Sequence, residues 1–373
     1  MEEGKGKVEV KEKIKFKNLD REQKKQMITM FSSLTLIFVI VLVYFCSVLF
    51  VENYTSNERW YSHLKDSPEQ AARAAKLAKD AQQVEVGIYI ENLRSLDMKN
   101  SEYRAGMMVW FKWKGDPELD PANNFRVYKG YENKKTVITE IHDDDINYQL
   151  VGMDVTVSKN YHTKLFPLES HQLRLYVEST YPIQEVHFKA DKENSGFNED
   201  LTITGFDFDR FAIGQLTYEY NSSHGNPHVE GKEMSSEVVT AFEIKRTDIG
   251  LFFKCFIALF ATLIWLLISL YVCTYHHVNP LGMVSGALFG AVGNIVVGAN
   301  LLPDGTAGGL LEYGNIWGTL VILGGVIAII SINRVRDVVS KDYAKYYGRF
   351  LFNMILAFAV IGMVLLPVFA IVR

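Results

Sequence analysis

The densest acidic cluster in the sequence is Asp143, Asp144 and Asp145, which directly follow His142. Ca²⁺ prefers several carboxylate oxygens, so the cluster is a candidate calcium site, although its spacing is not that of an EF-hand loop. Crowded carboxylates also bind protons more readily, because their like charges repel. The cluster is therefore a candidate sensor for Ca²⁺ or protons. The alternative is a loop whose charges are simply solvated.

The rest of the chain shows no pattern typical of a catalytic centre. It contains no evident pair of nucleophile and base, no phosphate-binding loop and no metal-ligand motif. We therefore expect a protein that is not an enzyme, needs no cofactor and binds no nucleic acid.

Five apolar stretches are long enough to cross a bilayer as helices, which takes roughly 20 residues each. The first is too long for a typical signal peptide and lacks a small-x-small cleavage site, so we expect an uncleaved anchor. Lys and Arg gather before residue 28 and between the last two stretches, which favours the cytoplasmic side for both. We expect a multi-pass protein of the cell (inner) membrane, with its N-terminus in the cytoplasm. The stretches lie at about 29–51, 249–272, 281–302, 313–333 and 349–371.

The polar block between the first two stretches, residues 52–247, is large enough to bury a core of its own. Ser67 and Pro68 predict the start of a short helix that continues to about residue 82. Alternation of apolar and polar residues then predicts an antiparallel β-sandwich on the extracellular or periplasmic side. The predicted strands lie at 84–90, 107–113, 151–157, 173–177 and 236–245.

Four further motifs follow one another along the chain. They are the strand pair at 84–116, the turn LFPLESHQL at 165–173, the junction EIKRTDIGLFF at 243–253 and the helix end GNIVVGANLLPDG at 293–305. Together they resemble the pentameric ligand-gated ion channel superfamily, that is, the Cys-loop receptors and their prokaryotic relatives. The cysteines of the family's disulfide are missing, as is usual for prokaryotic members.

The resemblance implies an extracellular antiparallel β-sandwich and an α-helical transmembrane bundle of four channel helices. This chain would add one N-terminal anchor helix. If residues 52–66 were extended, they would span roughly 50 Å, enough to climb the sandwich. The expected domains are a cytoplasmic basic N-terminus (1–28), the anchor (29–51), a linker and short helix (52–83), a ligand-sensing β-sandwich (84–247) and the channel domain (248–373).

The candidate pore helix is the span that begins at Asn279-Pro280. Residues on one of its faces recur in steps of three and four, and an apolar ring on such a stripe can close a pore by dewetting. Another face carries Gly282, Gly286 and Gly290, a spacing that suits close helix packing. The resemblance implies that the pore is lined by Leu281, Ser285, Leu288, Val292, Ile295 and Ala299.

In the family, the turn at 165–173 projects from the base of the sandwich onto the channel helices. Glu169 is then expected to pair with Arg246, because a partly buried carboxylate needs a cation. The alternative is a turn that packs only against its own sandwich. The residues implied to form the gating interface are Lys99, Asn100, Phe166, Pro167, Leu168, Glu169, Arg246, Pro303 and Asp304.

Family members bind agonists between subunits in a box of aromatic side chains, and such boxes attract cations. The residues that match in this chain are Trp110, Trp113, Tyr181, Tyr218 and Tyr220. The alternative assigns these aromatics to the sandwich core or to interface packing.

These implications describe a ligand-gated-type ion channel, a homopentamer in a lipid membrane that passes small ions, with cations favoured. Its modulator would be a small molecule, protons or Ca²⁺. The alternative is a non-conducting membrane receptor or assembly module on the same fold. The glycine-rich pore helix and the lack of a Trp-x-Pro-Asp stretch favour that alternative.

Overall fold

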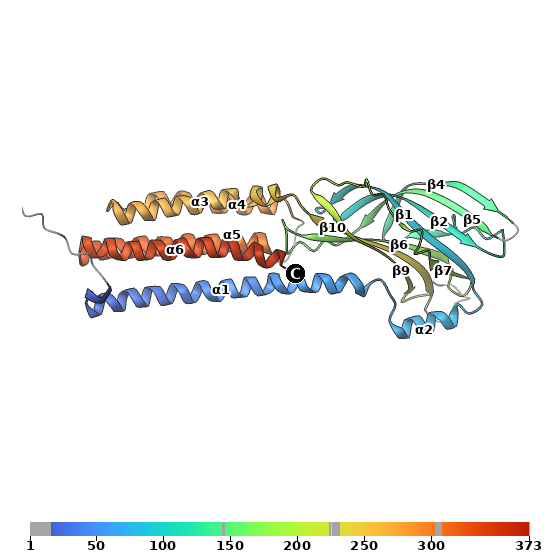
Figure 1. Ribbon diagram of the computed structural model, residues 1–373, viewed down its shortest axis with the longest axis horizontal. Helices are drawn as coiled ribbons and strands as arrows, with labels where there is room; N and C mark the ends of the chain where they lie inside the picture. The colour runs from blue at the N-terminus through green and yellow to red at the C-terminus, as the bar shows by residue number, and fades with distance from the viewer. Residues whose placement is uncertain (1–15, 144–145, 224, 226–231, 303–307, 373) are drawn as a thin grey trace, which may run out of the picture. The chain divides into compact units, whose positions relative to one another are not determined.

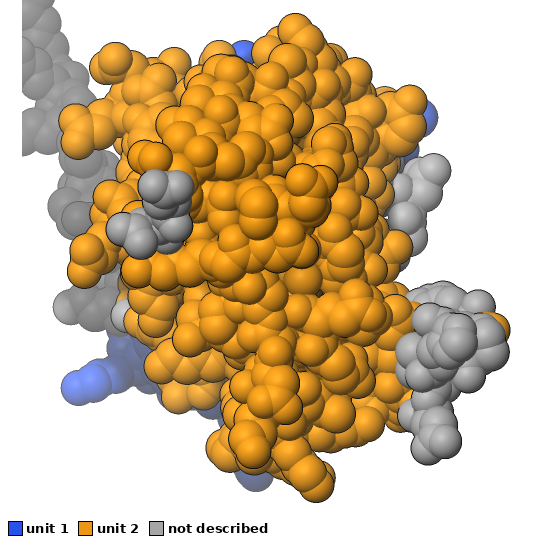
Figure 2. All heavy atoms as spheres, turned by 90° about the vertical axis from the view of Figure 1, so that its right-hand side faces the viewer, with its two compact units in different colours: residues 1–49, 253–298, 310–370 blue, residues 50–252, 299–309, 371–373 orange. Residues whose placement is uncertain are grey.

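A computed structural model describes residues 16–143, 146–223, 225, 232–302 and 308–372 of the chain, and Figure 1 labels its helices and strands. The chain divides into two compact units, which Figure 2 shows in different colours. The helical unit comprises Met1–Leu49, Phe253–Gly298 and Leu310–Ala370. The sheet unit comprises Phe50–Phe252, Ala299–Gly309 and Ile371–Arg373.

The helical unit is built from long apolar helices, four of which are long and apolar enough to cross a membrane. These four are α1 (Arg21–Ser62), α3 (Ile249–Tyr275), α5 (Leu310–Val338) and α6 (Lys341–Ile371), and they indicate a membrane protein. A single turn of 3₁₀ helix, Phe16–Asn18, precedes α1.

The fifth expected span corresponds to the shorter helix α4 (Leu281–Ala299). Its 19 residues have a length of about 28 Å at 1.5 Å per residue, slightly less than the roughly 30 Å of a bilayer core. The expected stretch extended to residue 302, but residues 300–302 form a turn and a bend. The described helices therefore give four clear spans and one shorter apolar helix, rather than five equal spans.

The N-terminal helix packs on α5 and α6 through phenylalanines spaced by seven residues. Phe38 stacks on Phe358 with ring centroids 4.3 Å apart and meets Trp317 edge-on at 5.2 Å. Phe45 stacks on Tyr313 at 4.3 Å. A spacing of seven keeps such residues on one helix face, so α1 packs in the helical unit as far as Leu49.

We expect Phe38→Ala to lower the thermal midpoint of the detergent-solubilised protein by several degrees. It removes two aromatic pairs, each of which contributes about 0.5–1.5 kcal/mol. The matched control is Ile37→Ala, because Ile37 is 52% exposed whereas Phe38 is 2% exposed. Equal shifts for the two variants in differential scanning fluorimetry would contradict this packing role.

The sheet unit contains two β-sheets that share one hydrophobic core, which gives it a sandwich-like build. One sheet has the strand order β4-β5-β2-β1-β7, with β8 also paired to β1, and the other has the order β3-β6-β10-β9. The strands are β1 (Gln82–Asp97), β2 (Glu102–Trp113), β3 (Phe125–Val127), β4 (Gly130–His142), β5 (Asn147–Ser158), β6 (Ser170–Pro182), β7 (Val186–Ala190), β8 (Gly196–Phe197), β9 (Phe206–Glu219) and β10 (Met234–Arg246).

The five strands predicted from alternation all form, as parts of β1, β2, β5, β6 and β10. The expectation of a wholly antiparallel sandwich is wrong, because β1 pairs in parallel with both β7 and β8. After β6 the chain turns at residues 183–185 and crosses to the other sheet, where β7 enters beside β1 in the same direction.

The linker expected to be extended over residues 52–66 is instead mostly helical, because α1 continues to Ser62. Its end packs on the sheet: Trp60 and Leu64 are buried with Val239 and Ala241 of β10. The burial of Trp60 stabilises the helical conformation of this segment. The short helix α2 (Pro68–Leu77) then begins as predicted, capped by the Ser67 side chain, but ends five residues before the expected boundary at 82.

Candidate functional site

The apolar turn between β5 and β6 is buried within the sheet unit. Leu165, Phe166 and Pro167 are buried and Leu168 is half-buried. Two other segments of the sheet unit lie close to this turn. Lys164 pairs with Glu52 of α1 at 3.0 Å, and a Cβ atom added at Gly309 would come within 2.4 Å of the Lys164 carbonyl oxygen. The turn therefore contacts the end of α1 and the residue just before α5, and does not pack only on its own strands.

The predicted contact between Glu169 and Arg246 forms. Arg246 donates from Nε and Nη2 to Glu169 Oε1, at 2.9 and 2.8 Å, and the backbone amide of Arg246 donates to the Glu169 carbonyl oxygen. The guanidinium also lies over the rings of Phe206 and Phe166, at 4.2 and 5.9 Å. This pair fixes the turn to the last residue of β10.

The carboxyl of Glu169 stays ionised although its side chain is only 1% exposed. Burial alone would raise its pKa, but His171 and Arg246 face the carboxyl and hold the pKa below its usual value. His171 Nε2 lies 3.5 Å from Glu169 Oε1, and burial lowers the pKa of His171, so this imidazole is neutral near pH 7. Arg246 is therefore the cation that balances Glu169.

The other residues implied at the gating interface are placed differently. Lys99 and Asn100 are exposed in the turn between β1 and β2, where the Asn100 amide donates to Asp97 at 2.9 Å. Pro303 and Asp304 lie outside the described residues.

We expect Glu169→Gln and Arg246→Gln each to lower the free energy of unfolding by about 3 kcal/mol, because each leaves one buried ion without its partner. The double variant is expected to lose less free energy of unfolding than the two single variants lose in sum. The matched control is Lys112→Gln, which breaks an exposed 2.8 Å pair with Glu85 and is expected to cost less than about 1 kcal/mol. Additive losses in chemical denaturation would show that the pair is not coupled.

The five aromatics expected to form a ligand box do not come together. Trp113 is only 2% exposed in the hydrophobic core, which makes it a core residue rather than a ligand-binding one. Trp110 lies on the opposite face of β2 and donates to Asp191 at 3.0 Å. Tyr181 packs against the core, and only Tyr218 and Tyr220 share a cluster, with ring centroids 4.6 Å apart.

A polar aromatic cluster forms around these two tyrosines. Tyr128 lies 4.9 Å from Tyr218, centroid to centroid, and their hydroxyls are 3.0 Å apart. Arg126 pairs with Glu178 at 2.8 Å and lies over the Tyr220 ring at 5.7 Å, and the Tyr220 hydroxyl also bonds to Glu178. Sequence reasoning missed Arg126 and Tyr128, although they alternate with the buried Phe125 and Val127 and so face away from the core.

Beside this cluster, the side chain of Glu237 on β10 is unusual because its carboxyl is protonated near neutral pH. The residue is 3% exposed, and its Oε1 has no hydrogen-bond partner among the described residues. Burial first, and then the negative charges of Glu178 and Asp66, raise the pKa of Glu237 from 4.5 to about 8. The protein therefore carries a buried group that loses its proton at mildly alkaline pH.

We expect the stability of the wild-type protein to fall as the pH rises from about 4.5 to about 8. Across this range the unfolded chain has released the Glu237 proton and the folded chain still holds it, so alkali favours unfolding. Glu237→Gln should remove this slope. Its gain in stability over the wild-type protein should be largest above pH 8. Thermal midpoints between pH 5 and 9 test this, with exposed Glu193→Gln as control. An unchanged slope in Glu237→Gln would contradict the assignment.

The acidic loop gives no support for a metal site in its described part. Asp143 is exposed, and Asp144 and Asp145 lie outside the described residues. Within the part of the chain that the structure describes, no three His, Cys, Asp or Glu side chains are grouped as metal ligands. His142 bonds to Asn147 at 2.9 Å and to Glu140 at 3.1 Å, and these bonds raise its pKa.

Helix α4 has one buried face, and the predicted pore stripe does not lie on it. Leu281, Val292 and Ile295 are 38%, 58% and 47% exposed, Ser285 is exposed and Leu288 is half-buried. The side chain of Ala299 is outside the described set. The buried residues are Val284, Ala287, Ala291 and Asn294.

Polar and small residues hold the buried side of α4 against its neighbours. Asn294 donates to Asn315 Oδ1 of α5 at 2.7 Å, and both side chains are buried. At Gly290 a Cβ atom would come within 2.2 Å of Thr262 Cγ2 on α3, so this glycine permits close contact. Gly282 has open space instead, so the expected glycine face packs only in part.

No protein-family model matches the chain, and no curated protein matches its sequence. The interpretation of α4, the turn and the tyrosine cluster therefore rests on their geometry and on the motifs.

Proposed function

We propose that the chain is one subunit of a pentameric ligand-gated-type ion channel that passes small ions, with cations as the favoured class. The observation that carries the proposal is the exposed stripe of α4. Four of the residues that the motifs place on the pore, Leu281, Ser285, Val292 and Ile295, are exposed in the described part of the chain, whereas one adjoining face of α4 is buried.

The exposed part of α4 is wider than a pore stripe alone. Phe289 and Val296 are 79% and 56% exposed, and they lie about 60–80° from the stripe at 100° per residue. A helix in a ring needs two such surfaces, one for the central axis and one for the neighbouring copy. Together with the stripe they cover roughly 120°, about a third of the helix circumference.

The stripe suits a gate that closes by excluding water. Leu288, Val292 and Ile295 are apolar, and Ser285 lies one turn nearer the start of α4, with its hydroxyl bonded to the Gly282 carbonyl oxygen at 2.7 Å. A ring of such residues would exclude water without any charged plug. In the proposed orientation the N-terminus is cytoplasmic and the sheet unit lies outside.

A direct covalent path leads from the sheet unit to the channel helices. Only Thr247 and Asp248 separate the end of β10 from the start of α3. Arg246, which ends β10, is fixed to the turn through Glu169. A ligand that favours one arrangement of β10 would therefore shift the balance between closed and open states.

The second candidate function is a non-conducting receptor or assembly module. It is favoured by the burial of Trp113 in the hydrophobic core, which takes one of the expected box residues out of reach of an agonist. Ion flux from liposomes that contain the purified oligomer, recorded across pH and Ca²⁺ concentration, separates the two. Flux supports the channel, and silence from an assembled oligomer supports the module.

We expect Leu288→Ser to raise flux in the absence of ligand roughly tenfold, equivalent to about 1.4 kcal/mol in the closed–open equilibrium. The serine would admit water to the apolar ring and weaken the closed state. The matched control is Ile257→Ser on α3, which is 65% exposed and off the stripe. Native mass spectrometry should show five copies for both variants. Equal flux from the two would contradict the pore assignment.

A further inference from the structure

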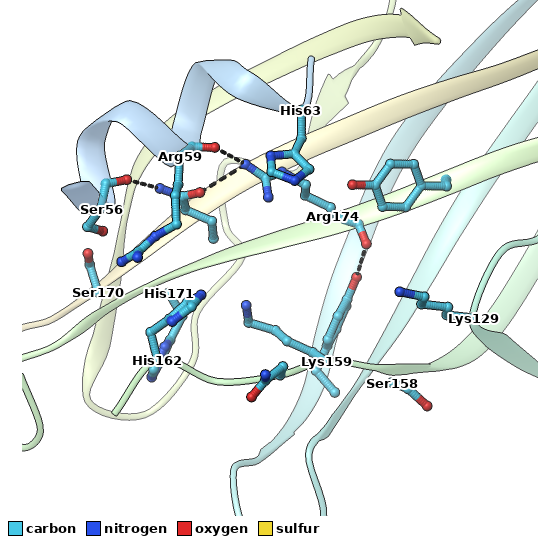
Figure 3. Close-up of a pocket in the computed structure, with 14 residues that line it drawn as sticks. Ser56, Arg59, His63, Lys129, Ser158, Lys159, His162, Ser170, His171 and Arg174 are labelled. Atoms are coloured by element: carbon cyan, nitrogen blue, oxygen red, sulfur yellow. Dashed lines mark hydrogen bonds between the residues drawn. The ribbon is translucent and has the colours of Figure 1, made fainter. Parts of the chain in front are cut away.

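A cavity of about 320 Å³ opens at the surface of the sheet unit, where the end of α1 meets β6 and the segment after β5 (Figure 3). The lining shares no residue with the tyrosine cluster or the acidic loop, but its Tyr176 meets Tyr128 of the cluster edge-on, with ring centroids 6.2 Å apart. Four cationic side chains line it, together with three histidines, and none of its fourteen lining residues is an Asp or Glu. The cations are Arg59, Lys129, Lys159 and Arg174, and the histidines are His63, His162 and His171.

Among the residues that the structure describes, only one of these cations has a carboxylate partner. Arg59 Nη2 pairs with Glu52 at 2.6 Å. Arg174 donates from Nη2 to the carbonyl oxygen of Arg59 at 2.6 Å and to Gln172 Oε1 at 3.0 Å, so these partners are neutral (Figure 3). Arg174 Nε is buried and has no hydrogen-bond partner among the described residues. Arg174 therefore brings a charge into the cavity that no carboxylate of the described chain balances.

Lys159 adds a second uncompensated charge. Its ammonium lies over the Tyr161 ring, 5.2 Å from the ring centroid, and no carboxylate stands among the residues that line the cavity with it. Burial first, and then the positive charges of Arg174 and Arg59, lower the pKa of Lys159 to about 7. Burial also lowers the pKa of Arg174. Cations that are brought together away from water are costly unless an anion joins them.

We propose that this cavity binds a small oxyanion with at least two negative charges, of the phosphate or dicarboxylate type. Arg174 and Lys159 are the residues that recognise it. The volume corresponds to roughly ten waters at about 30 Å³ each, which suits a phosphate, a phosphate ester or a short dicarboxylate. Phosphates and carboxylates match the fork of a guanidinium, and an ammonium adds a point charge.

The anion would join two segments that are far apart in the sequence. Ser56, Arg59 and His63 reach the cavity from α1 and the residue after it, whereas Gln172 and Arg174 reach it from β6. Binding would therefore strengthen the contact between the end of α1 and the sheet. This inference is independent of the channel proposal, because the cavity lies within one unit of one chain.

The first test is anion-dependent thermal stability of the full-length protein in detergent. Sodium sulfate, phosphate, succinate and chloride are titrated at constant ionic strength and pH 6.5. We expect saturable rises in midpoint with sulfate and succinate, which are mainly divalent at this pH, a smaller rise with phosphate, which is mainly monovalent there, and little change with chloride. No rise with any divalent anion, or an equal rise with chloride, would overturn the proposal.

The second test uses variants of the two recognising residues. Arg174→Gln and Lys159→Gln should each weaken sulfate binding at least tenfold in isothermal titration calorimetry. Exposed Lys76→Gln, which is outside the cavity, should leave it unchanged. Since Arg174 also bonds to the end of α1, Lys159→Gln provides the decisive result if Arg174→Gln does not fold. Wild-type affinity in Lys159→Gln would overturn the assignment.

The third test uses pH, with sulfate because it stays divalent. Wild-type affinity should fall about tenfold from pH 6 to pH 8, as Lys159 loses its proton. This dependence should vanish in Lys159→Gln. Burial lowers the pKa of His63, His162 and His171, so these histidines hold their protons more weakly than an ordinary imidazole does. The other ionisable groups on the cavity wall are Arg59, Tyr103, Lys129, Arg174 and Tyr176.

The oxyanion could come from a soluble ligand or from a lipid headgroup. The two sources are distinguished by comparing nanodiscs of phosphatidylcholine with nanodiscs that contain phosphatidic acid. Stabilisation by free phosphate in phosphatidylcholine discs indicates a soluble ligand. Stabilisation that appears only with phosphatidic acid, and that Lys159→Gln abolishes, indicates a lipid headgroup at the same site. Stabilisation by phosphatidic acid that is equal in Lys159→Gln would count against the cavity.

Discussion

The ion pair between Glu169 and Arg246 is the constraint on which the arrangement of the β5–β6 turn and the end of β10 depends. Both side chains are nearly inaccessible to water, at 1% and 9% exposure, so neither charge can separate from the other without remaining buried and unpaired. The turn that carries Phe166 and the last residue of β10 therefore behave as one body. Because α3 begins three residues after Arg246, a displacement of β10 is a displacement of the residues that enter α3.

Contacts of α4 with α3 and α5 form a second constraint, which determines which face of α4 is buried. The helix is apolar almost all round, and hydropathy alone does not separate residues that face lipid, a neighbouring copy or water. The buried face of α4 separates them. Asn294 bonds to Asn315 and Gly290 leaves room for the Thr262 side chain, and these two contacts fix the rotation of α4 against α3 and α5. Once these contacts are set, the stripe through Val292 and Ile295 is left exposed in the described part of the chain. The proposed ring of copies gives that stripe a physical role.

The sequence predicted features that depend on local pattern, and missed those that depend on distant contacts. Alternation located five strands, and Ser67 capped α2 as expected. The core position of Trp113 was also within reach, because it shares a strand face with Phe111. The parallel pairing of β7 and the extension of α1 were not, because each is decided by segments far away in the chain. The edge strand β4 was missed because its exposed, charged residues do not alternate cleanly.

The extension of α1 and the cationic cavity have a common physical cause. The last carbonyl groups of a helix have no intrahelical partners and carry partial negative charge, so a cation near them is stabilised. Arg174 of β6 occupies this position, since Nη2 donates to the carbonyl oxygens of Arg59 and Trp60 in the last turn of α1. The helix end thus holds a guanidinium at the cavity wall but supplies only part of its countercharge. Because Lys159 adds a charge that the helix end does not offset, the same contact that attaches α1 to the sheet leaves the cavity electropositive.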